Sequence, residues 1–249
     1  MPDFNLTGWR PADAASAEAQ VELLAAEDAY ELLTEVNHDH DGTSDDFLLF
    51  EDVAGYTEGS LPAVAAHLHY GEDGTSFSLV TERMPTFALA ASWLAQRGAE
   101  TDAFLDRAGH PGAPADARSA SAAARLLESG SRYRLVEHGA EPGETWAMLR
   151  DGSAAGADRP FLLHLETVDP DRGYTLREGS FGSPQEAQQW LENRRTPLPP
   201  VADGDVTVVV SPQANAARTR TGTGQHRPVA AEPAPALATP AATPRRAVR

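Results

Sequence analysis

The chain has 249 residues, no cysteine and a formal net charge of −17 at neutral pH. That length suffices for one large or two small domains, and the absence of cysteine excludes disulfides, thiolate metal sites and thiol nucleophiles. No apolar run reaches the roughly 18 residues of a membrane span, and the N-terminus lacks the basic and apolar regions of a signal peptide. We therefore expect a cytoplasmic protein that does not bind membranes.

The negative charge is concentrated in the first hundred residues. Residues 1–100 contain 19 acids and 3 arginines, residues 101–200 contain 15 acids and 11 arginines, and residues 201–249 contain 3 acids and 6 arginines. Such an excess repels phosphate backbones and favours basic partners. Neither lysine nor isoleucine occurs, which we attribute to a GC-rich bacterial genome.

Two pairs of segments resemble each other and indicate an internal duplication. Residues 11–33 align without a gap on 114–136, and residues 63–97 align on 160–194. We therefore predict two repeats, 11–98 and 114–195, joined by a linker at 99–113. The identical residues that carry the comparison, apart from alanines, are Pro11/Pro114, Asp13/Asp116, Ser16/Ser119, Leu23/Leu126, Leu24/Leu127, Tyr30/Tyr133, Leu32/Leu135, His67/His164, Leu68/Leu165, Leu79/Leu176, Trp93/Trp190, Leu94/Leu191 and Arg97/Arg194.

Each repeat has the pattern of a helix, four strands and a second helix. An aspartate in an N-cap position opens an alanine-rich helix, four segments with strand character follow, and a closing amphipathic helix carries the tryptophan. The predicted fold class is α+β: an internally duplicated α-ββββ-α unit with antiparallel sheets and helices on one face. Because one repeat alone buries a modest core, we expect the two sheets to join into one pseudo-symmetric domain.

The composition changes after residue 195. Residues 196–249 form a segment rich in proline, alanine and arginine, which we predict to be a linker and a disordered tail. Residues 206–210, "VTVVV", are a possible edge strand. Nucleic acid is expected to bind, if at all, only through the arginines of the tail, which are Arg218, Arg220, Arg227, Arg245, Arg246 and Arg249.

The stretch "EVNHDHDGTSDD", residues 35–46, is the first candidate metal site. It matches the beginning of a calcium-binding loop, but the position of the closing glutamate is Leu48. Histidines and aspartates spaced by two residues are also able to ligate a divalent cation. We interpret the stretch as a solvated hairpin loop and keep a metal site as the alternative, with His38, Asp39, His40 and Asp41 as ligands.

The third predicted strand contains a second candidate. His67 and His69 share one face of that strand, and the alignment gives His67 a counterpart in His164. Two imidazoles at this spacing form half of a zinc site, which a carboxylate such as Glu51 or Glu166 is able to complete. The alternative interpretation is that these histidines only cover the polar face of a sheet.

We find no nucleotide-binding glycine motif and no serine nucleophile motif in the sequence. The leading hypothesis is a non-enzymatic binding or regulatory protein without a cofactor, whose acidic surface meets a basic protein partner. One alternative is a metal-dependent hydrolase or other small-molecule enzyme that uses the histidines and nearby carboxylates. A second alternative is a DNA-associated accessory protein.

Overall fold

The structure is a computed structural model, which describes residues 6, 8–40, 42–53, 61–105, 110, 112–141, 143–153, 156–169 and 171–201. The side chains of Glu27 and His40 are not described either. By its internal contacts the chain divides into residues 1–206 and 207–249, and every described residue belongs to the first unit. The possible edge strand at 206–210 and the tail arginines lie outside the described residues.

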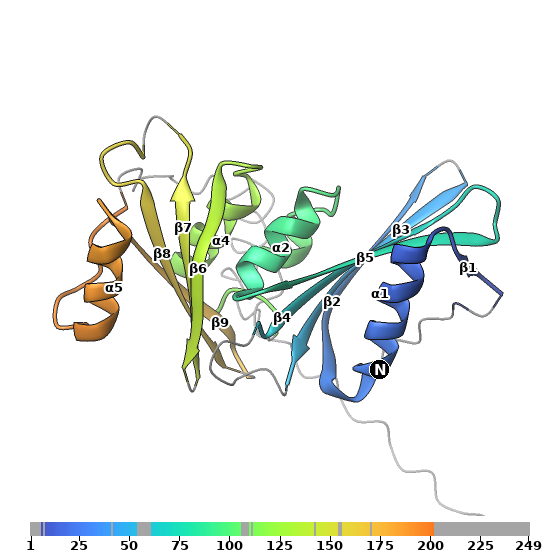
Figure 1. Ribbon diagram of the computed structural model, residues 1–249, viewed down its shortest axis with the longest axis horizontal. Coiled ribbons are helices and arrows are strands. Elements are labelled where there is room, and N and C mark those ends of the chain that lie inside the picture. Colours follow the sequence, from blue (N-terminus) through green and yellow to red (C-terminus); the bar gives the residue numbers. More distant parts are fainter. Residues whose placement is uncertain are drawn as a thin grey trace, which may run out of the picture. The chain divides into compact units, whose positions relative to one another are not determined.

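The expected order of elements is present in both halves of this unit (Figure 1). A helix, four long strands and a closing helix follow one another twice. The segment predicted as a linker contains an additional short helix, α3. The elements are β1 (Arg10–Pro11), α1 (Ala14–Ala25), the 3-10 turn η1 (Glu27–Ala29), β2 (Tyr30–His40), β3 (Thr43–Asp52), β4 (Ala63–Tyr70), β5 (Ser76–Met84), α2 (Phe87–Ala95), α3 (Asp102–Leu105), α4 (Ala117–Leu127), β6 (Tyr133–Glu141), β7 (Glu144–Asp151), β8 (Phe161–Asp169), β9 (Gly173–Phe181) and α5 (Pro184–Asn193).

The strands form two sheets, so the expectation of one joined sheet is wrong for the described residues. The first sheet has the order β1-β5-β4-β3-β2 and the second the order β6-β7-β8-β9. The long strands pair antiparallel in both sheets, and the two-residue β1 adds to β5 in parallel. The fold is therefore α+β with two separate sheets.

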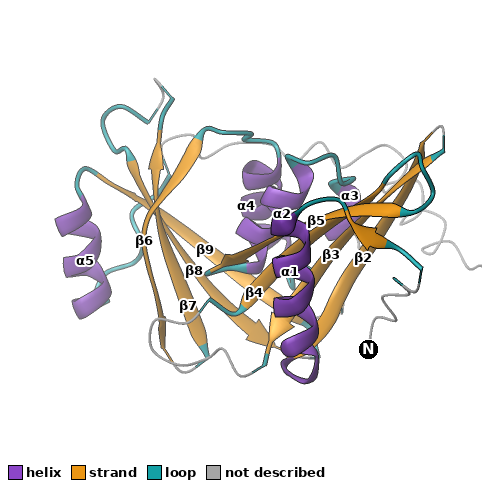
Figure 2. Cartoon of the chain, turned by 45° about the vertical axis from the view of Figure 1, so that its right-hand side comes forward, coloured by secondary structure: helices purple, strands orange, loops and turns teal. Residues whose placement is uncertain are grey.

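Helices lie on both faces of each sheet, which corrects the prediction of one covered face. Leu48 and Phe50 of β3 pack on the side of α1, while Phe47 and Leu49 of the same strand pack on the side of α2. In the second sheet, α4 and α5 likewise lie on opposite faces (Figure 2). Both faces are covered because the strands contain continuous apolar runs, such as residues 47–50, instead of a strict alternation.

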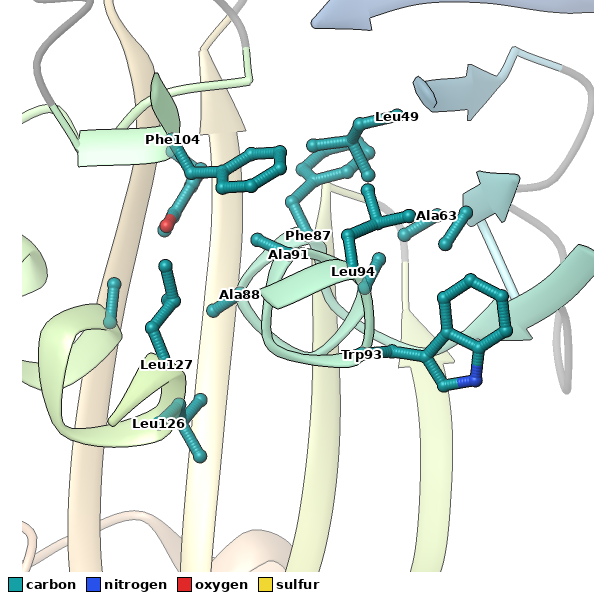
Figure 3. Packing of buried hydrophobic residues seen from close by; sticks show 14 of the residues in the cluster. Leu49, Ala63, Phe87, Ala88, Ala91, Trp93, Leu94, Phe104, Leu126 and Leu127 are labelled. Carbon is teal, nitrogen blue, oxygen red and sulfur yellow. The ribbon is translucent and has the colours of Figure 1, made fainter. Parts of the chain in front are cut away.

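One hydrophobic core joins the two halves. It contains buried residues of both sheets together with α2, α3 and α4, and α2 packs directly against α4. Figure 3 shows Phe87, Ala88 and Ala91 of α2 in this core, close to Phe104 and Leu127. The layers therefore run from α1 through the first sheet, the α2/α4 layer and the second sheet to α5 (Figure 1).

The first helices of the two halves begin in the same way. The Asp13 side chain accepts a hydrogen bond from the backbone N–H of Ser16 at 2.7 Å, and Asp116 accepts one from Ser119 at 2.8 Å. Both aspartates have the extended backbone of an N-cap residue. The sequence prediction of these two helix starts is confirmed, since an aspartate in this position satisfies an otherwise free helical N–H.

The same helices are anchored to the fourth strand of their sheet by a buried serine. Ser16 Oγ accepts a hydrogen bond from the Leu79 N–H at 3.2 Å, and Ser119 Oγ accepts one from the Leu176 N–H at 2.9 Å. Both serines are at most 2% exposed. Each hydrogen bond satisfies a strand N–H that points away from the neighbouring strand.

The edge strands β2 and β6 carry a bulge at matching places. The register with the next strand shifts between Leu32 and Thr34 in β2 and between Leu135 and Glu137 in β6. A bulge changes which face the following side chains occupy, so it decides which residues of these strands enter the core. Among the described residues, no helix is long and apolar enough to cross a membrane.

Candidate functional site

The stretch 35–46 is mostly strand, so its interpretation as a solvated loop is corrected. Strand β2 continues to His40 and β3 begins at Thr43, with these two residues paired. Two residues separate these strands in the sequence, and the second of them, Gly42, has a φ of 94°, which favours glycine. Aspartate followed by glycine is a strong signal for a two-residue hairpin.

This hairpin aligns acidic and histidine side chains across three strands. In the register, Asp45 of β3 lies opposite His38 of β2 and also opposite His69 of β4. His67 precedes His69 by two residues and therefore shares its face. We call His38, Asp45, His67 and His69 the histidine cluster.

Asp45 is the centre of the histidine cluster. Its Oδ1 atom lies 2.8 Å from Nε2 of His67 and 2.9 Å from Nδ1 of His69. An ionised carboxylate only accepts hydrogen bonds, so each of these ring nitrogens carries the proton. Asp45 was not among the ligands predicted from the sequence, although counting back from the Asp-Gly dipeptide between the strands pairs it with His38.

Aromatic and acidic neighbours hold the rings of the cluster. The His67 ring stacks on Phe47, with centroids 4.5 Å apart and planes inclined by 7°. The His38 ring contacts the edge of the same phenyl ring, and its Nε2 lies 3.5 Å from Glu100 Oε1. The side chains of His67 and Asp45 are 19% and 18% exposed and that of His69 is 43% exposed, so the cluster is open to solvent on one side.

The imidazoles stabilise the charged form of Asp45. Partial burial acts to raise the pKa of this carboxyl, but the hydrogen bonds from His67 and His69 outweigh burial and leave the pKa below its ordinary value. The cluster is consequently an anionic aspartate between two histidines. Protonation of either ring converts the contact into an ion pair.

The other predicted ligands do not join the cluster. Asp39 follows His38 directly and so points to the opposite face. Glu51 pairs with Ala63, four residues away from His67 along β4. Asp41 and the side chain of His40 lie outside the described residues, among which no group of three or more His, Asp or Glu side chains has an arrangement that could hold a metal ion.

His164 is not the counterpart of His67. His67 lies on the α2 side of the first sheet, stacked on Phe47, whereas His164 lies on the α4 side of the second sheet with Leu162. The gapless alignment fails because the turn between β8 and β9 is one residue shorter than the aligned turn, and a slip of one residue moves every side chain to the other face.

The pairing of the third and fourth strands in each sheet shows the same shift by one residue. Leu68 is paired with Leu79 in the first sheet, whereas Glu166 is paired with Leu176 in the second. The residue that corresponds to Leu68 by register is therefore Glu166 and not Leu165.

Glu166 is a buried acid at the contact between the two halves. It is 1% exposed, and its carboxyl oxygens accept hydrogen bonds from the backbone N–H groups of Phe87 at 2.6 Å and Ala88 at 3.2 Å. Burial raises the pKa of Glu166 to about 8, against the effect of these two hydrogen bonds. A residue of the second sheet thus caps the N-terminus of α2.

A second cluster of buried polar side chains lies between α4 and the second sheet. Arg125 of α4 forms an ion pair with Glu178 of β9, and His164 Nε2 lies 3.6 Å from the other oxygen of Glu178. Burial acts to raise the pKa of Glu178, but His164 and Arg125 outweigh it and lower this pKa. His164 is fully buried, so this group holds α4 on the sheet and is closed to a ligand.

A shallow hollow of about 240 Å³ lies beside α1 on the first sheet. Its polar wall is the guanidinium of Arg83, which donates to Asp52 at 2.8 Å and to the hydroxyl of Tyr30 at 2.5 Å. The Arg83 guanidinium is therefore already bound by Asp52 and Tyr30 within the fold. The residues that line the hollow are Glu22, Leu23, Tyr30, Val64, Thr81, Glu82 and Arg83.

Comparison with known proteins finds no protein family that matches this chain and no curated protein with a significant match. The candidate site therefore rests on its geometry alone.

Proposed function

We propose that this protein is a non-enzymatic binding module, built from a duplicated α-ββββ-α unit, whose acidic N-terminal half binds a basic protein partner. The observation that carries the proposal is a difference in charge. The two halves have the same order of elements, but the N-terminal half has far fewer arginines to neutralise its acids. Residues 1–100 have 3 arginines for 19 acids, whereas residues 101–200 have 11 arginines for 15 acids. A surface with uncompensated negative charge attracts cationic partners over long range.

Repeated local contacts support the duplication. The chain before each first helix adds to the fourth strand in the same way: the Ala12 N–H donates to the Phe77 carbonyl at 2.7 Å, and the Ala115 N–H donates to the Tyr174 carbonyl at 2.8 Å. Together with the aspartate caps, the buried serines and the matching bulges, these contacts recur at the same steps of both units. A duplication accounts for the recurrence of all these contacts.

Ion pairs show how the C-terminal half uses its arginines. Arg132 binds Asp151 through two hydrogen bonds of 2.9 and 2.7 Å, and Arg177 binds the helix cap Asp116 at 2.6 Å. Arg194 lies 2.5 Å from Glu144. These arginines neutralise acids within the fold, while the N-terminal half has too few arginines to do so.

A comparison of two charge variants tests this proposal. In the first variant, four exposed acids of the N-terminal half are replaced by amides: Glu18→Gln, Glu31→Gln, Glu72→Gln and Glu82→Gln. The matched control changes the same number of exposed acids in the C-terminal half: Glu128→Gln, Asp158→Asn, Asp171→Asn and Glu192→Gln.

Full-length protein and both variants would be used to capture partners from a lysate of the source cells. We expect basic proteins that are released at high salt and are lost with the first variant only, since exposed charge attraction is screened by salt. Capture that is unaffected by the first variant, or equally reduced by the control, would contradict the proposal.

A histidine-dependent enzyme is the second candidate function. The observation in its favour is that Asp45 brings His67 and His69 to one point on the sheet. The described side chains alone do not form a metal site, so a metal-dependent enzyme would need Asp45 together with ligands outside them. Elemental analysis of dialysed full-length protein and of the Asp45→Ala variant tests this. A stoichiometric divalent metal that is lost in the variant would favour the enzyme, and absence of metal from the wild-type protein would count against it.

A further inference from the structure

Helices α1 and α4 occupy matching places in the two halves but differ in how they are covered. Counted from their aspartate caps, Leu24 of α1 corresponds to Leu127 of α4, and Val21 corresponds to Ala124. Leu127 is 5% exposed, whereas Leu24 is 49% and Val21 is 66% exposed. The two helices therefore differ at one edge: α4 buries Leu127 and half-buries Ala124 there, whereas Leu24 and Val21 are exposed on α1.

Helix α2 is what covers α4. The Ser92 hydroxyl of α2 donates a hydrogen bond to the Leu126 carbonyl at 2.9 Å, and Leu127 lies in the shared core with Ala88 of α2 (Figure 3). Small side chains of α2 allow the two helices to approach closely. Helix α1 instead has its main contacts with β5, β1 and η1.

We propose that the outer face of α1, formed by Ala17, Val21 and Leu24, is a docking site for an amphipathic helix of the basic partner. The bound helix would lie on α1 as α2 lies on α4. This inference rests on the proposed function, because it assumes a basic protein partner and specifies which surface receives it.

Charge identifies the occupant as a basic partner and not a second copy of this chain. Helix α1 carries Glu18 and Glu22 and no basic residue, whereas α4 has Arg125 at the position that matches Glu22. Pairing α1 with its own copy would oppose like charges at the rim of the apolar face, which is unfavourable. A helix with small apolar residues along one side and arginine or lysine at its flanks complements this surface.

The other end of the unit lacks a comparable surface. Helix α5 corresponds to α2, but the positions of Ala88 and Ser92 are taken by Gln185 and Gln189, which are exposed. A polar outer face is typical of the last element of a repeated structure. Of the two outermost helices that the structure describes, α1 and α5, only α1 therefore has the apolar docking face.

A pair of synthetic helical peptides tests the docking site. Both carry the α2 face of Ala88, Ala91, Ser92 and Ala95, and the remaining positions are arginine in one peptide and glutamate in the other. Binding to the full-length chain would be measured by fluorescence anisotropy, for the wild-type protein and for Leu24→Gln. The matched control is Val80→Gln, since Val80 is 46% exposed and lies on the opposite face of the first sheet.

We expect the arginine peptide to bind and the glutamate peptide to bind far more weakly. Leu24→Gln should weaken binding of the arginine peptide by about threefold to tenfold, because only the exposed half of the Leu24 side chain is left to be buried by the peptide. Val80→Gln should leave binding unchanged. Circular dichroism would show that both variants are folded.

The outcomes separate the docking site from the proposed function. Equal binding of the arginine peptide to wild-type protein and Leu24→Gln would overturn the docking site and leave the acidic binding module intact. Failure of the arginine peptide to bind would also overturn it, whereas the proposed function is decided by the charge variants. Equal binding of both peptides would contradict the role of charge in both proposals.

Discussion

Glu166 is a buried side chain at the contact between the two halves of this protein. It belongs to the second sheet but caps a helix of the first half. In the sequence it is one acid among many in a strand, and nothing in its neighbourhood indicates burial. Its environment depends on the packing of α2 against the second sheet.

Replacing Glu166 by glutamine should flatten the dependence of stability on pH. The folded-state pKa is about 8, above the ordinary value of 4.5. The contribution of Glu166 is therefore fully present below pH 4.5 and is lost as the pH rises through 8. The difference between these two pKa values corresponds to about 5 kcal/mol of unfolding free energy, at roughly 1.4 kcal/mol per pKa unit.

Urea unfolding of the wild-type protein and of Glu166→Gln at pH 5, 7 and 9 would check this expectation. The wild-type protein should lose more free energy of unfolding toward alkaline pH than the variant does. Glu192→Gln, on the exposed side of α5, is the control. The same slope in all three proteins would show that Glu166 is not buried as described.

Asp45 should act in the opposite direction. Its pKa lies below the ordinary value of 3.8, so its contribution to stability is present above pH 3.8 and is lost as the pH falls through the lowered pKa. We expect Asp45→Asn to be less stable than the wild-type protein at neutral pH and to approach it in acid. Circular dichroism between pH 7 and pH 2 measures the acid unfolding of the wild-type protein and of Asp45→Asn, and Asp39→Asn, at an exposed residue, is the control. Acid transitions that are the same in all three proteins would contradict the expectation.

At the scale of elements, each first helix is attached to its sheet through one buried serine. Ser119→Ala removes the acceptor of the Leu176 N–H and should lower the free energy of unfolding by about 1–3 kcal/mol, the cost of an unsatisfied buried group. Ser121 on the same helix is partly exposed, so Ser121→Ala should have little effect on the free energy of unfolding. Chemical denaturation distinguishes the two, and equal effects would remove the role assigned to Ser119.

Sequence reasoning was successful for local features and failed for the faces of the strands. The order of helices and strands and the two aspartate caps were predicted, because caps, turns and periodicity depend on nearby residues. The third strand was misaligned between the halves by one residue, which paired His67 with His164. Residue types alone do not show in which turn the two halves differ in length, and a shift of one residue exchanges the faces.

The candidate site was predicted in part. His38 and His67 were selected from the sequence and lie in the histidine cluster, whereas Asp45, which connects His67 to His69, was overlooked. Glu166 was selected for a different role, as a ligand beside His67. The register of three neighbouring strands decides these contacts, and it becomes visible only when the hairpin is formed.

At the scale of the whole unit, the shared core predicts that both halves unfold together. Trp9 and Trp93 report on the N-terminal half and Trp146 and Trp190 on the other. In protein with Trp146→Phe/Trp190→Phe and in protein with Trp9→Phe/Trp93→Phe, the midpoint in urea measured by tryptophan fluorescence should equal the midpoint measured by circular dichroism on the same protein. Separate midpoints would mean that the two halves are independent.

Ala91 provides a sharper test of that coupling. It is 2% exposed in α2, within the core that contains residues of both sheets. Ala91→Leu should destabilise by about 1–3 kcal/mol through overpacking, and fluorescence of both tryptophan pairs should shift together. A shift seen by only one pair would place the α2–α4 contact outside the cooperative core.

The helix starts, the α+β class, the charge difference between the halves and the repeated order of elements could all be predicted from the residues alone. Long-range packing places helices on both faces of each sheet, keeps the sheets separate around α2 and α4, and brings Asp45 and Glu166 to their partners. The physical reason is that capping and turn formation involve residues close in the chain, whereas face, register and burial depend on contacts between residues far apart.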